Sequence, residues 1–320
     1  MTPPRLRILL TRRWPSPVED ALAERYDVTR NVDDVALDMD ALAAAMRDYD
    51  AICPTLTDRL PAALFTAPGR RTRIIANYGA GFEHIDVAAA HAAGVVVTNT
   101  PDVLTDATAD IALTLMLMAS RRASEGEREL RAEEWTGWRP THLLGSSLSG
   151  KTLGLIGYGR IARATAARAK AFGMRILYHS RSRAEDMPAD AYRATPVALA
   201  ADADMVSLHA PGGDATRHMV DAAFLSAMGP GGILINTARG TLIDEAALAA
   251  ALTGREIAAA GLDVYATEPR VDPALLACPN IVLLPHLGSA THETRIAMGM
   301  RVAENLDAFF AGQGARDRLT

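Results

Sequence analysis

The chain of 320 residues has few cysteines and no long apolar run, and these absences exclude several classes of protein. Cys53 and Cys278 are its two cysteines, and they stand far apart without the spacing of metal ligands, which the histidines lack as well. A disulfide scaffold or a metal site is therefore not expected. No apolar stretch approaches the roughly 18 residues of a membrane-spanning helix, and the apolar run at residues 8–10 is too short for a signal peptide. We therefore expect a cytoplasmic protein that makes no membrane contact.

Positive charge is also sparse. Lysine and arginine number 33 against 38 aspartates and glutamates, so the formal net charge is −5, and the arginine pairs are short and scattered. Proteins that bind nucleic acid usually concentrate positive charge on one face, so no nucleic-acid partner is expected. Hydrophobic residues make up 49% and charged residues 22%, which is typical of a globular protein, here of about two domains.

Strand and helix patterns alternate along the chain, and they predict an α/β fold with parallel sheets. The strands predicted in the first hundred residues are 6–11, 26–30, 51–53, 74–76 and 95–97. Those predicted after residue 150 are 153–156, 174–178, 204–208, 232–236, 259–262 and 281–284, a complete doubly wound unit. An apolar helix over 107–119 is expected to bridge two domains. A final helix over 291–310 is expected to return to the first domain, which lacks a closing element.

A glycine-rich turn follows the first strand of the second unit and leads into an amphipathic helix. Gly157 permits the tight turn, Gly159 lets the backbone approach a pyrophosphate, and Ala162 lets the helix pack closely on the strand. The helix N-terminus, at Arg160 and Ile161, offers unpaired N–H groups to the phosphates. This pattern predicts a dinucleotide site.

The tip of the next strand lacks the acidic residue that usually binds a free ribose 2′-hydroxyl. The nearest acid is Glu185, whereas Ser180, Arg181 and Arg183 offer a hydroxyl and two guanidinium groups. Guanidinium binds phosphate oxygens through paired, charge-assisted hydrogen bonds, so the tip suits a 2′-phosphate. We therefore predict a preference for NADPH over NADH. The alternative is that the two arginines merely solubilise a surface loop.

Three polar residues follow the ends of successive predicted strands, where open α/β sheets bind ligands. His286 could deliver a proton to a carbonyl oxygen during hydride transfer, because its ordinary pKa lies near neutral pH. Glu268 could orient the imidazole and favour its protonated form, and Arg239 could hold a substrate carboxylate and polarise the adjacent carbonyl. Each also has a structural alternative: a satisfied histidine, a glutamate that shapes a turn before Pro269, and an arginine that caps a loop.

In this order along the chain, the motifs resemble those of the D-isomer-specific 2-hydroxyacid dehydrogenases over nearly the whole sequence. The segments that carry the resemblance are 157–162, 209–211, 236–240, 263–269 and 285–288. It implies a flavodoxin-like substrate domain at 1–99 and 288–320, into which an NAD(P)-binding Rossmann domain at 100–287 is inserted. Residues 134–140 and the basic cofactor tip look most like glyoxylate/hydroxypyruvate reductases. The implied reaction is reduction of a small 2-oxo acid to the D-2-hydroxy acid by NADPH, here of glyoxylate to the achiral glycolate or of hydroxypyruvate to D-glycerate, with NADH as a poorer cofactor.

The resemblance also implies individual contacts. The backbone N–H groups of Ala80 and Gly81 would bind the substrate carboxylate, a role that suits a glycine-rich turn after a strand, although a plain turn is the alternative. Trp138 would complete the pocket of the partner in a homodimer. Two tryptophans in one polar loop also suggest an interface, unless they pack within one subunit. Further cofactor contacts would come from Thr108, His209, Pro211, Thr237, Ala238, Asp263, His286 and Gly288.

Two other functions stay open at this point. A phosphoglycerate dehydrogenase would need more cationic groups for its substrate phosphate, often carries an added regulatory domain, and usually uses NAD. A nucleotide-sensing interaction protein, similar to the corepressors that resemble this family, could retain Arg239, Glu268 and His286.

Overall fold

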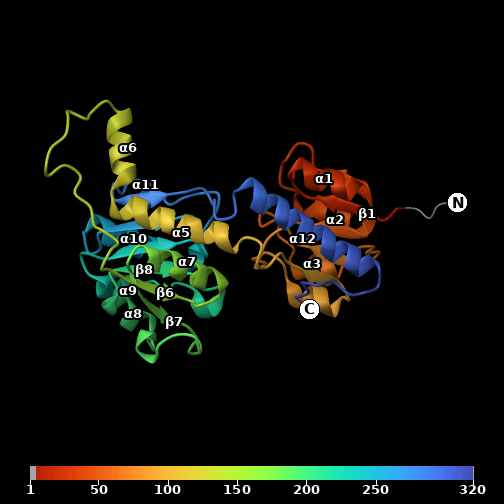
Figure 1. Cartoon of the computed structure of the whole chain (residues 1–320). Helices are drawn as coiled ribbons and strands as arrows, with labels where there is room; N and C mark the ends of the chain where they lie inside the picture. Colours follow the sequence, from red (N-terminus) through yellow and green to blue (C-terminus); the bar gives the residue numbers. More distant parts are fainter. Residues whose placement is uncertain (1–4, 320) are drawn as a thin grey trace. The chain divides into compact units, whose positions relative to one another are not determined.

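The computed structural model describes residues 5–319 and divides them into two compact units. The first unit contains residues 5–104 and 290–319, and the second contains residues 105–289 (Figure 1). The chain thus leaves and re-enters the first unit a few residues after the boundaries expected from the sequence. The long apolar helix, α5 (Thr105–Ser120), begins at the first crossing and lies wholly in the second unit instead of bridging the two.

The first unit is built on a five-stranded parallel sheet in the order β2-β1-β3-β4-β5, which is the flavodoxin-like order. Its strands are β1 (Arg7–Leu10), β2 (Asp27–Arg30), β3 (Ala51–Cys53), β4 (Ile74–Ala76) and β5 (Val96–Thr98). Its helices are α1 (Ser16–Ala23), α2 (Met39–Asp48), α3 (Ala62–Phe65), α4 (Val87–Ala92) and α12 (His292–Phe310).

Alternate side chains of these strands enter two separate cores, as the two-residue period of a strand requires. Ile8 and Leu10 pack with α1 and α12, whereas Leu9 packs with α2 and α3 on the other face. The contact between α1 and α12 is close, because a Cβ added at Gly299 would lie 2.5 Å from Cγ1 of Val18. The predicted return of the final helix to the first unit is therefore confirmed.

The second unit has a six-stranded parallel sheet in the order β11-β10-β9-β8-β6-β7. A single parallel bridge between Tyr178 and Tyr192 extends it beyond β7. The strands are β6 (Thr152–Ile156), β7 (Arg175–His179), β8 (Met205–Leu208), β9 (Ile233–Asn236), β10 (Ala259–Leu262) and β11 (Ile281–Leu283). The other helices are α6 (Ala123–Arg131), α7 (Arg160–Ala171), α8 (Pro196–Asp202), α9 (Ala222–Met228), α10 (Glu245–Thr253) and α11 (Pro273–Leu276), with 3-10 turns at Ala189–Ala191, Asp214–Thr216 and Gly240–Leu242.

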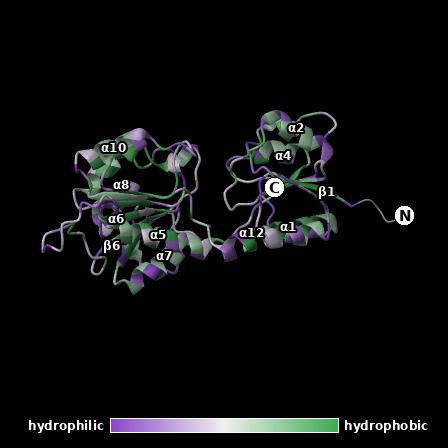
Figure 2. Cartoon of the chain, turned by 90° about the horizontal axis from the view of Figure 1, so that it is seen from above, coloured by the Kyte–Doolittle hydropathy of each residue, from purple (hydrophilic) through white to green (hydrophobic). Residues whose placement is uncertain are grey.

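Helices cover both faces of this second sheet. The helices α5 and α7 lie on one face, and α8, α9 and α10 lie on the other. Small residues in the strands allow the close packing: Gly154 of β6 lies against Leu199 of α8, and Gly261 of β10 lies against Leu115 of α5. Figure 2 shows that hydrophobic residues concentrate on the strands of each unit. The predicted fold, a Rossmann domain inserted in a flavodoxin-like domain, is confirmed.

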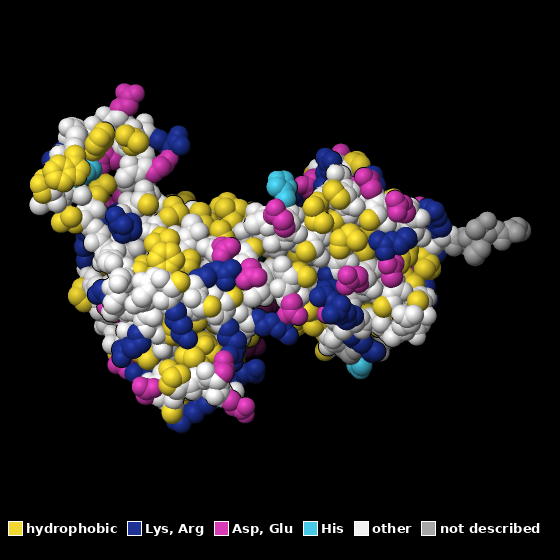
Figure 3. Space-filling model, in the orientation of Figure 1, with side chains coloured by type: hydrophobic (Ala, Val, Ile, Leu, Met, Phe, Trp, Pro, Cys, Tyr) yellow, Lys and Arg dark blue, Asp and Glu magenta, His cyan; other side chains and the backbone are white. Residues whose placement is uncertain are grey.

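The helix α6 was not expected from the sequence. None of the residues described within it is buried, and its sequence is strongly polar, with Leu130 as its one large apolar residue. Exposed apolar side chains occur on α6 and on the segment that follows it, namely Leu130, Trp135, Trp138 and Leu144. Figure 3 shows hydrophobic side chains gathered on this projecting part of the second unit. Within residues 5–319, no helix is long and apolar enough to cross a membrane.

Candidate active site

The structure brings together Glu268 and His286, which follow β10 and β11 in the second unit. His286 Nδ1 lies 2.8 Å from Glu268 Oε2, and Glu268 Oε1 accepts a hydrogen bond from the backbone N–H of Tyr265 at 3.0 Å. The two side chains remain 32% and 27% exposed, so a ligand can reach them. Because Nδ1 faces the carboxylate, Nε2 is the ring nitrogen that can meet a substrate.

Arg239, which follows β9, contributes to the electrostatics of this pair. Partial burial opposes ionisation of Glu268, but the hydrogen bond from His286 and the positive charges of His286 and Arg239 together hold its pKa below the usual range. The carboxylate is therefore ionised at neutral pH and can accept the hydrogen bond of the imidazole beside it. All three candidate catalytic residues thus interact at the carboxyl ends of neighbouring strands.

The loop that carries Arg239 is held by a buried asparagine and by a glycine. Asn236 donates through Nδ2 to the backbone oxygen of Arg239 at 2.8 Å and accepts from the N–H of Ala238 at 2.9 Å. A Cβ added at Gly240 would lie only 1.8 Å from the carbonyl carbon of Tyr265. The loop after β9 therefore packs directly on the loop after β10. The loop after β10 carries Glu268. Both residues belong to the motif at residues 236–240, but the sequence alone predicts no role for either of them.

Asp263 anchors the loop that carries His286. It is 1% exposed, and its two carboxylate oxygens accept the backbone N–H groups of Leu287 at 2.6 Å and Gly288 at 2.8 Å. The backbone oxygen of Asp263 accepts the N–H of His286 at 2.9 Å. His286 adopts a φ of 54°, a strained value for a residue with a side chain, and these bonds fix it there. Burial raises the pKa of Asp263, although the two backbone donors act in the opposite direction.

Thr108 on α5 completes this anchor, since its Oγ1 donates to the backbone oxygen of Gly288 at 3.0 Å. The resemblance implied that Thr108, Asp263 and Gly288 contact the cofactor. The structure brings the three together as a support for the loop of His286. A direct contact with a cofactor stays a prediction for each of them.

The glycine-rich turn has the geometry that a dinucleotide requires. Gly157 has a φ of 83°, and a Cβ there would lie 2.9 Å from the backbone of both His209 and Ala210, so the turn packs tightly on the loop after β8. Gly159 is the N-cap of α7, and a Cβ added there would meet no described atom within 4 Å beyond its chain neighbours. Open space therefore lies beside the helix N-terminus, where Arg160 and Ile161 stand and a pyrophosphate would be bound.

Two further predicted cofactor residues lie at neighbouring strand ends. Within residues 5–319, the buried Oγ1 of Thr237 has no hydrogen-bond partner, as expected for a group that a ligand would satisfy. Burial lowers the pKa of His209 to about 4, so its ring is neutral, and its Nε2 lies 2.9 Å from Ser207 Oγ. Pro211 and Ala238 lie in the loops after β8 and β9, at least partly exposed. The residues present thus fit a nicotinamide dinucleotide.

Aromatic residues shape the loop after β7, where Ser180, Arg181 and Arg183 lie. The guanidinium of Arg183 lies 5.1 Å from the centre of the Tyr192 ring, and Ser180 Oγ donates to the backbone oxygen of Ser182. Arg181 is exposed. Stacking on a ring leaves the edge of a guanidinium directed outward as a hydrogen-bond donor. Tyr192 was not foreseen, because it is 12 residues beyond Ser180 and no motif links the two.

The loop at residues 77–82, in the first unit, turns three successive carbonyl groups inward. The buried Asn77 donates through Nδ2 to the oxygens of Gly79 at 3.0 Å and Gly81 at 2.8 Å. Asn99 donates through Nδ2 to the oxygen of Ala80 at 2.7 Å. In a trans peptide the N–H points away from the preceding carbonyl, so the N–H groups of Ala80 and Gly81 face the other side of the loop. Adjacent N–H groups arranged in this way can bind an anion.

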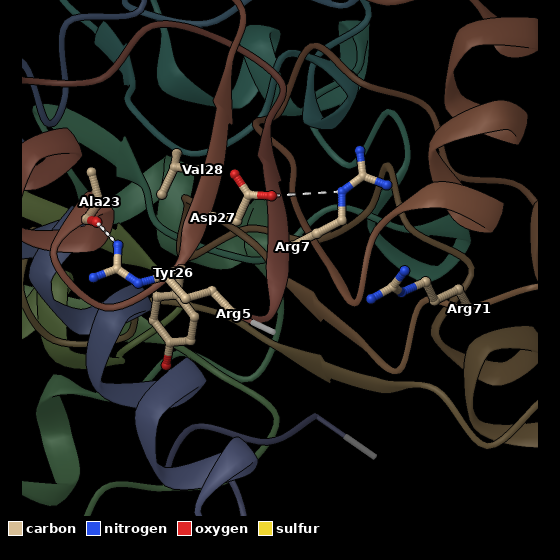
Figure 4. Close-up of a pocket in the computed structure, with 7 residues that line it drawn as sticks. All are labelled: Arg5, Arg7, Ala23, Tyr26, Asp27, Val28 and Arg71. Carbon is tan, nitrogen blue, oxygen red and sulfur yellow. Dashed lines mark hydrogen bonds and ion pairs between the residues drawn. The ribbon is translucent and has the colours of Figure 1, made fainter. Parts of the chain in front are cut away.

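A cavity of about 640 Å³ lies elsewhere, at the amino ends of β1 and β2 in the first unit (Figure 4). Arg5, Arg7 and Arg71 line it, with Arg5 donating to the backbone oxygen of Ala23 and Arg7 3.8 Å from Asp27. Open α/β sheets bind ligands at the opposite, carboxyl ends of their strands. No residue assigned to the site from the sequence lines this cavity, so it is not a candidate for the active site.

Trp138 is 81% exposed, on the segment that follows α6. It lies in the second unit, whereas the loop at residues 77–82 lies in the first. Its role in the pocket of a partner subunit stays a prediction.

The chain is similar to known proteins along most of its length. Residues 113–288 match the family model described as "D-isomer specific 2-hydroxyacid dehydrogenase, NAD binding domain". A glyoxylate reductase of Thermococcus litoralis is 41% identical over 314 residues, which cover 96% of this chain and 94% of the relative. A glyoxylate reductase of Aeropyrum pernix is 42% identical over 318 residues, which cover 97% and 94% of the two chains.

Solved structures show the same similarity. The NADPH-dependent glyoxylate/hydroxypyruvate reductase of Sinorhizobium meliloti, in complex with NADP and malonate, superposes with a TM-score of 0.88 and 40% identity. The match covers 99% of this chain and 97% of that one. With a matching family model and relatives of this identity along nearly the whole length, the chain belongs to the D-isomer-specific 2-hydroxyacid dehydrogenase family.

Proposed function

We propose that the protein reduces glyoxylate to glycolate, or hydroxypyruvate to D-glycerate, with NADPH as the preferred cofactor. The observation that carries this proposal is the contact of 2.8 Å between Glu268 and His286, with Arg239 close enough to lower the pKa of the glutamate. Relatives at about 41% identity named as glyoxylate reductases support the choice of substrate. A small 2-oxo acid has the carbonyl and the carboxylate that these residues could recognise.

His286, Glu268 and Arg239 each have one role in the proposed mechanism. When NADPH is bound, its nicotinamide supplies a hydride to the carbonyl carbon of the substrate. His286 holds on Nε2 the proton that the carbonyl oxygen receives. Glu268 fixes the orientation of the ring through Nδ1 and stabilises the imidazolium. Arg239 binds the substrate carboxylate and polarises the neighbouring carbonyl.

The substrate carboxylate is also proposed to bind the N–H groups of Ala80 and Gly81. Support comes from the inward carbonyls of residues 79–81, which leave these two N–H groups on the opposite side of the loop. Backbone donors of this kind recognise an anion without choosing among substituents on the substrate. They therefore suit both glyoxylate and hydroxypyruvate.

The preference for NADPH is proposed from the loop after β7. Arg181 is exposed, and the guanidinium of Arg183 lies over the Tyr192 ring, a contact that restricts its movement before a ligand arrives. A guanidinium held in this way loses little conformational entropy when it binds a 2′-phosphate. The solved relative from Sinorhizobium meliloti, named as NADPH-dependent, has NADP bound and supports the same choice.

The quaternary structure is proposed to be a homodimer in which Trp138 completes the pocket of the partner. Large apolar side chains are costly to leave in water, and Trp138 and Trp135 are 81% and 51% exposed on one segment. Tryptophan is enriched at the cores of protein interfaces. The exposed apolar side chains of this segment thus have the character of a surface that a second copy covers.

Steady-state kinetics with a panel of 2-oxo acids tests the proposed function. Glyoxylate, hydroxypyruvate, pyruvate and 3-phosphohydroxypyruvate would each be assayed with NADPH and with NADH. We expect kcat/KM to be largest for glyoxylate or hydroxypyruvate with NADPH. A dominant rate with the phosphorylated acid and NADH would indicate the phosphoglycerate type instead. Turnover of none of them, despite tight binding of the dinucleotide, would indicate a nucleotide-sensing protein.

A further inference from the structure

The segment Asp317–Leu319 lies along β5, at the edge of the first sheet. Thr98 and Arg318 form an antiparallel bridge, and the N–H of Leu319 donates to the oxygen of Val97 at 2.8 Å. The strands of this sheet all pair in parallel, so the segment is an addition of opposite direction at its edge. Its position places it next to Asn99, directly after β5.

The helix α12 holds Asp317 through side chains. Asn305 is fully buried, donates to Asp317 Oδ2 at 3.0 Å and accepts the N–H of Asp317 at 2.9 Å. Arg301 Nε lies 3.6 Å from Asp317 Oδ2. The side chains of Arg301 and Asp317 are 13% and 11% exposed, so water screens the ion pair little. Asp317 is thus fixed by both its backbone and its carboxylate.

Asn99 links this fixed segment to the loop at residues 77–82. Its backbone N–H donates to the oxygen of Asp317 at 3.3 Å, and its backbone oxygen lies 3.5 Å from Nδ2 of Asn305. Its side chain holds the oxygen of Ala80 at 2.7 Å. A continuous series of hydrogen bonds therefore runs from α12 through Asp317 and Asn99 to the peptide that carries the N–H of Gly81.

We propose that the segment Asp317–Leu319 positions the loop at residues 77–82, which is the proposed binding site of the substrate carboxylate. Asp317 is the positioning residue. The inference rests on the proposed function, because it takes the ligand of the loop to be the substrate carboxylate. Asp317 makes no contact with substrate in this scheme. It fixes the backbone of Asn99, whose amide then holds the carbonyl of Ala80 inward and the N–H of Gly81 toward the ligand.

Two kinetic consequences distinguish a role of Asp317 in positioning the loop at residues 77–82 from a role in the stability of the fold. Loosening the segment should weaken binding of the carboxylate, and so raise KM for the 2-oxo acid. It should leave kcat and KM for NADPH nearly unchanged, because Arg239, Glu268, His286 and the dinucleotide turn belong to the second unit. A variant that only lowered the folded fraction would instead lower the apparent kcat and leave KM unchanged.

The test uses Asp317→Ala, with Asp317→Asn as the conservative variant. The alanine variant lacks the contacts that Asp317 Oδ2 makes with Asn305 and Arg301. The asparagine variant keeps a side-chain oxygen that can accept a hydrogen bond from Asn305. Glu304→Gln is the matched control, because Glu304 Oε2 lies 3.5 Å from Nη1 of Arg301 but the Glu304 side chain is 57% exposed. We expect Asp317→Ala to raise KM for glyoxylate roughly fivefold to tenfold, the size of one lost hydrogen bond. The control should stay within twofold of the wild type, and the asparagine variant should lie between them.

Hydrogen exchange provides a readout that does not depend on activity. The peptide that spans residues 77–84 should exchange about tenfold faster in Asp317→Ala than in the wild type, and at the wild-type rate in the control. Asn99→Ala removes the last link directly and should show the same pattern, which keeps the test possible if Asp317→Ala folds poorly. Unchanged exchange and unchanged KM in well-folded variants would overturn the proposal. Faster exchange in an enzyme that does not reduce glyoxylate would uphold the positioning and refute the proposed function.

Discussion

Glu268 Oε2 lies 2.8 Å from Nδ1 of His286, although 18 residues and a further strand separate the two in sequence. The parallel sheet produces this contact, because β10 and β11 are neighbours and their carboxyl ends lie side by side. The Nδ1 atom of the imidazole contacts the carboxylate of Glu268, so Nε2 is the nitrogen that can exchange a proton with a substrate. A histidine oriented in this way can serve as a general acid for the reduction of a carbonyl.

Replacing Glu268 by glutamine should shift the pH profile of reduction. Reduction consumes the proton that His286 is proposed to deliver, so kcat/KM should fall on the alkaline side of the pH profile. The ionised Glu268, whose pKa is lowered in the fold, favours the proton on the ring. Without this charge the alkaline limb of the profile should move to lower pH. The measurement is kcat/KM from pH 5 to 10, with Glu256→Gln as control, and an unmoved limb would show that the charge does not act on the ring.

Removing both Arg181 and Arg183 should reduce the preference for NADPH. Each guanidinium is proposed to donate to the 2′-phosphate, and the double alanine variant should lose roughly 3 kcal/mol of that preference, about a hundredfold. The ratio of kcat/KM with NADPH to that with NADH measures it. Arg47→Ala, which removes an exposed arginine from α2 in the first unit, is the control. An unchanged ratio in the double variant would mean that the two arginines only serve solubility.

Gly240→Ala should destabilise the protein strongly. The new Cβ would lie 1.8 Å from the carbonyl carbon of Tyr265, so two backbone segments must separate. We expect a loss of roughly 3 kcal/mol in unfolding free energy, together with lower activity because Arg239 moves with the loop. Gly231→Ala is the control, since a Cβ there meets no described atom within 4 Å beyond its chain neighbours. Comparable melting temperatures for the two variants would contradict the close approach.

Mixed dimers test whether Trp138 acts across a subunit interface. Trp138→Ala alone should raise KM for glyoxylate about tenfold, the loss expected for one buried aromatic contact. When the Trp138→Ala protein is mixed with the inactive His286→Asn protein, hybrid dimers should recover activity. In each hybrid, the Trp138→Ala subunit has an intact His286 and receives an intact Trp138 from its partner. Leu276→Ala, an exposed apolar residue on α11, is the control. Absence of recovery, or a fully active monomer, would refute the cross-subunit role.

The sequence predicted those parts of the fold and of the site that depend on local pattern. Short apolar runs predicted the strands, because strands buried on both faces lack polar residues. The candidates for catalysis and for pyrophosphate binding could be named because they directly follow such strands. The helix α6 has only one large apolar residue, Leu130, and none of its residues is buried, so the apolar pattern did not reveal it.

The residues that support the site could not be predicted in the same way. Asn77, Asn99, Asn236 and Asp263 bind backbone groups, and any residue supplies those groups, so no sequence motif identifies the partners. Asn99 reaches Ala80 across 19 residues, and Asp263 reaches Leu287 across 24. Only the folded chain shows which loops they hold. A polar residue that ends a strand or directly follows it is the one signal that could have drawn attention to them.

The turnover of His286→Asn with glyoxylate and NADPH tests the central claim most directly. Asparagine keeps a polar side chain in the loop that Asp263 holds, but it cannot donate a proton as an imidazolium does. We predict that kcat falls by a factor of about 10² to 10⁴, while NADPH fluorescence still reports binding of the cofactor. A His286→Asn enzyme that reduces glyoxylate within a fewfold of the wild-type kcat would contradict the assignment of His286 as the proton donor.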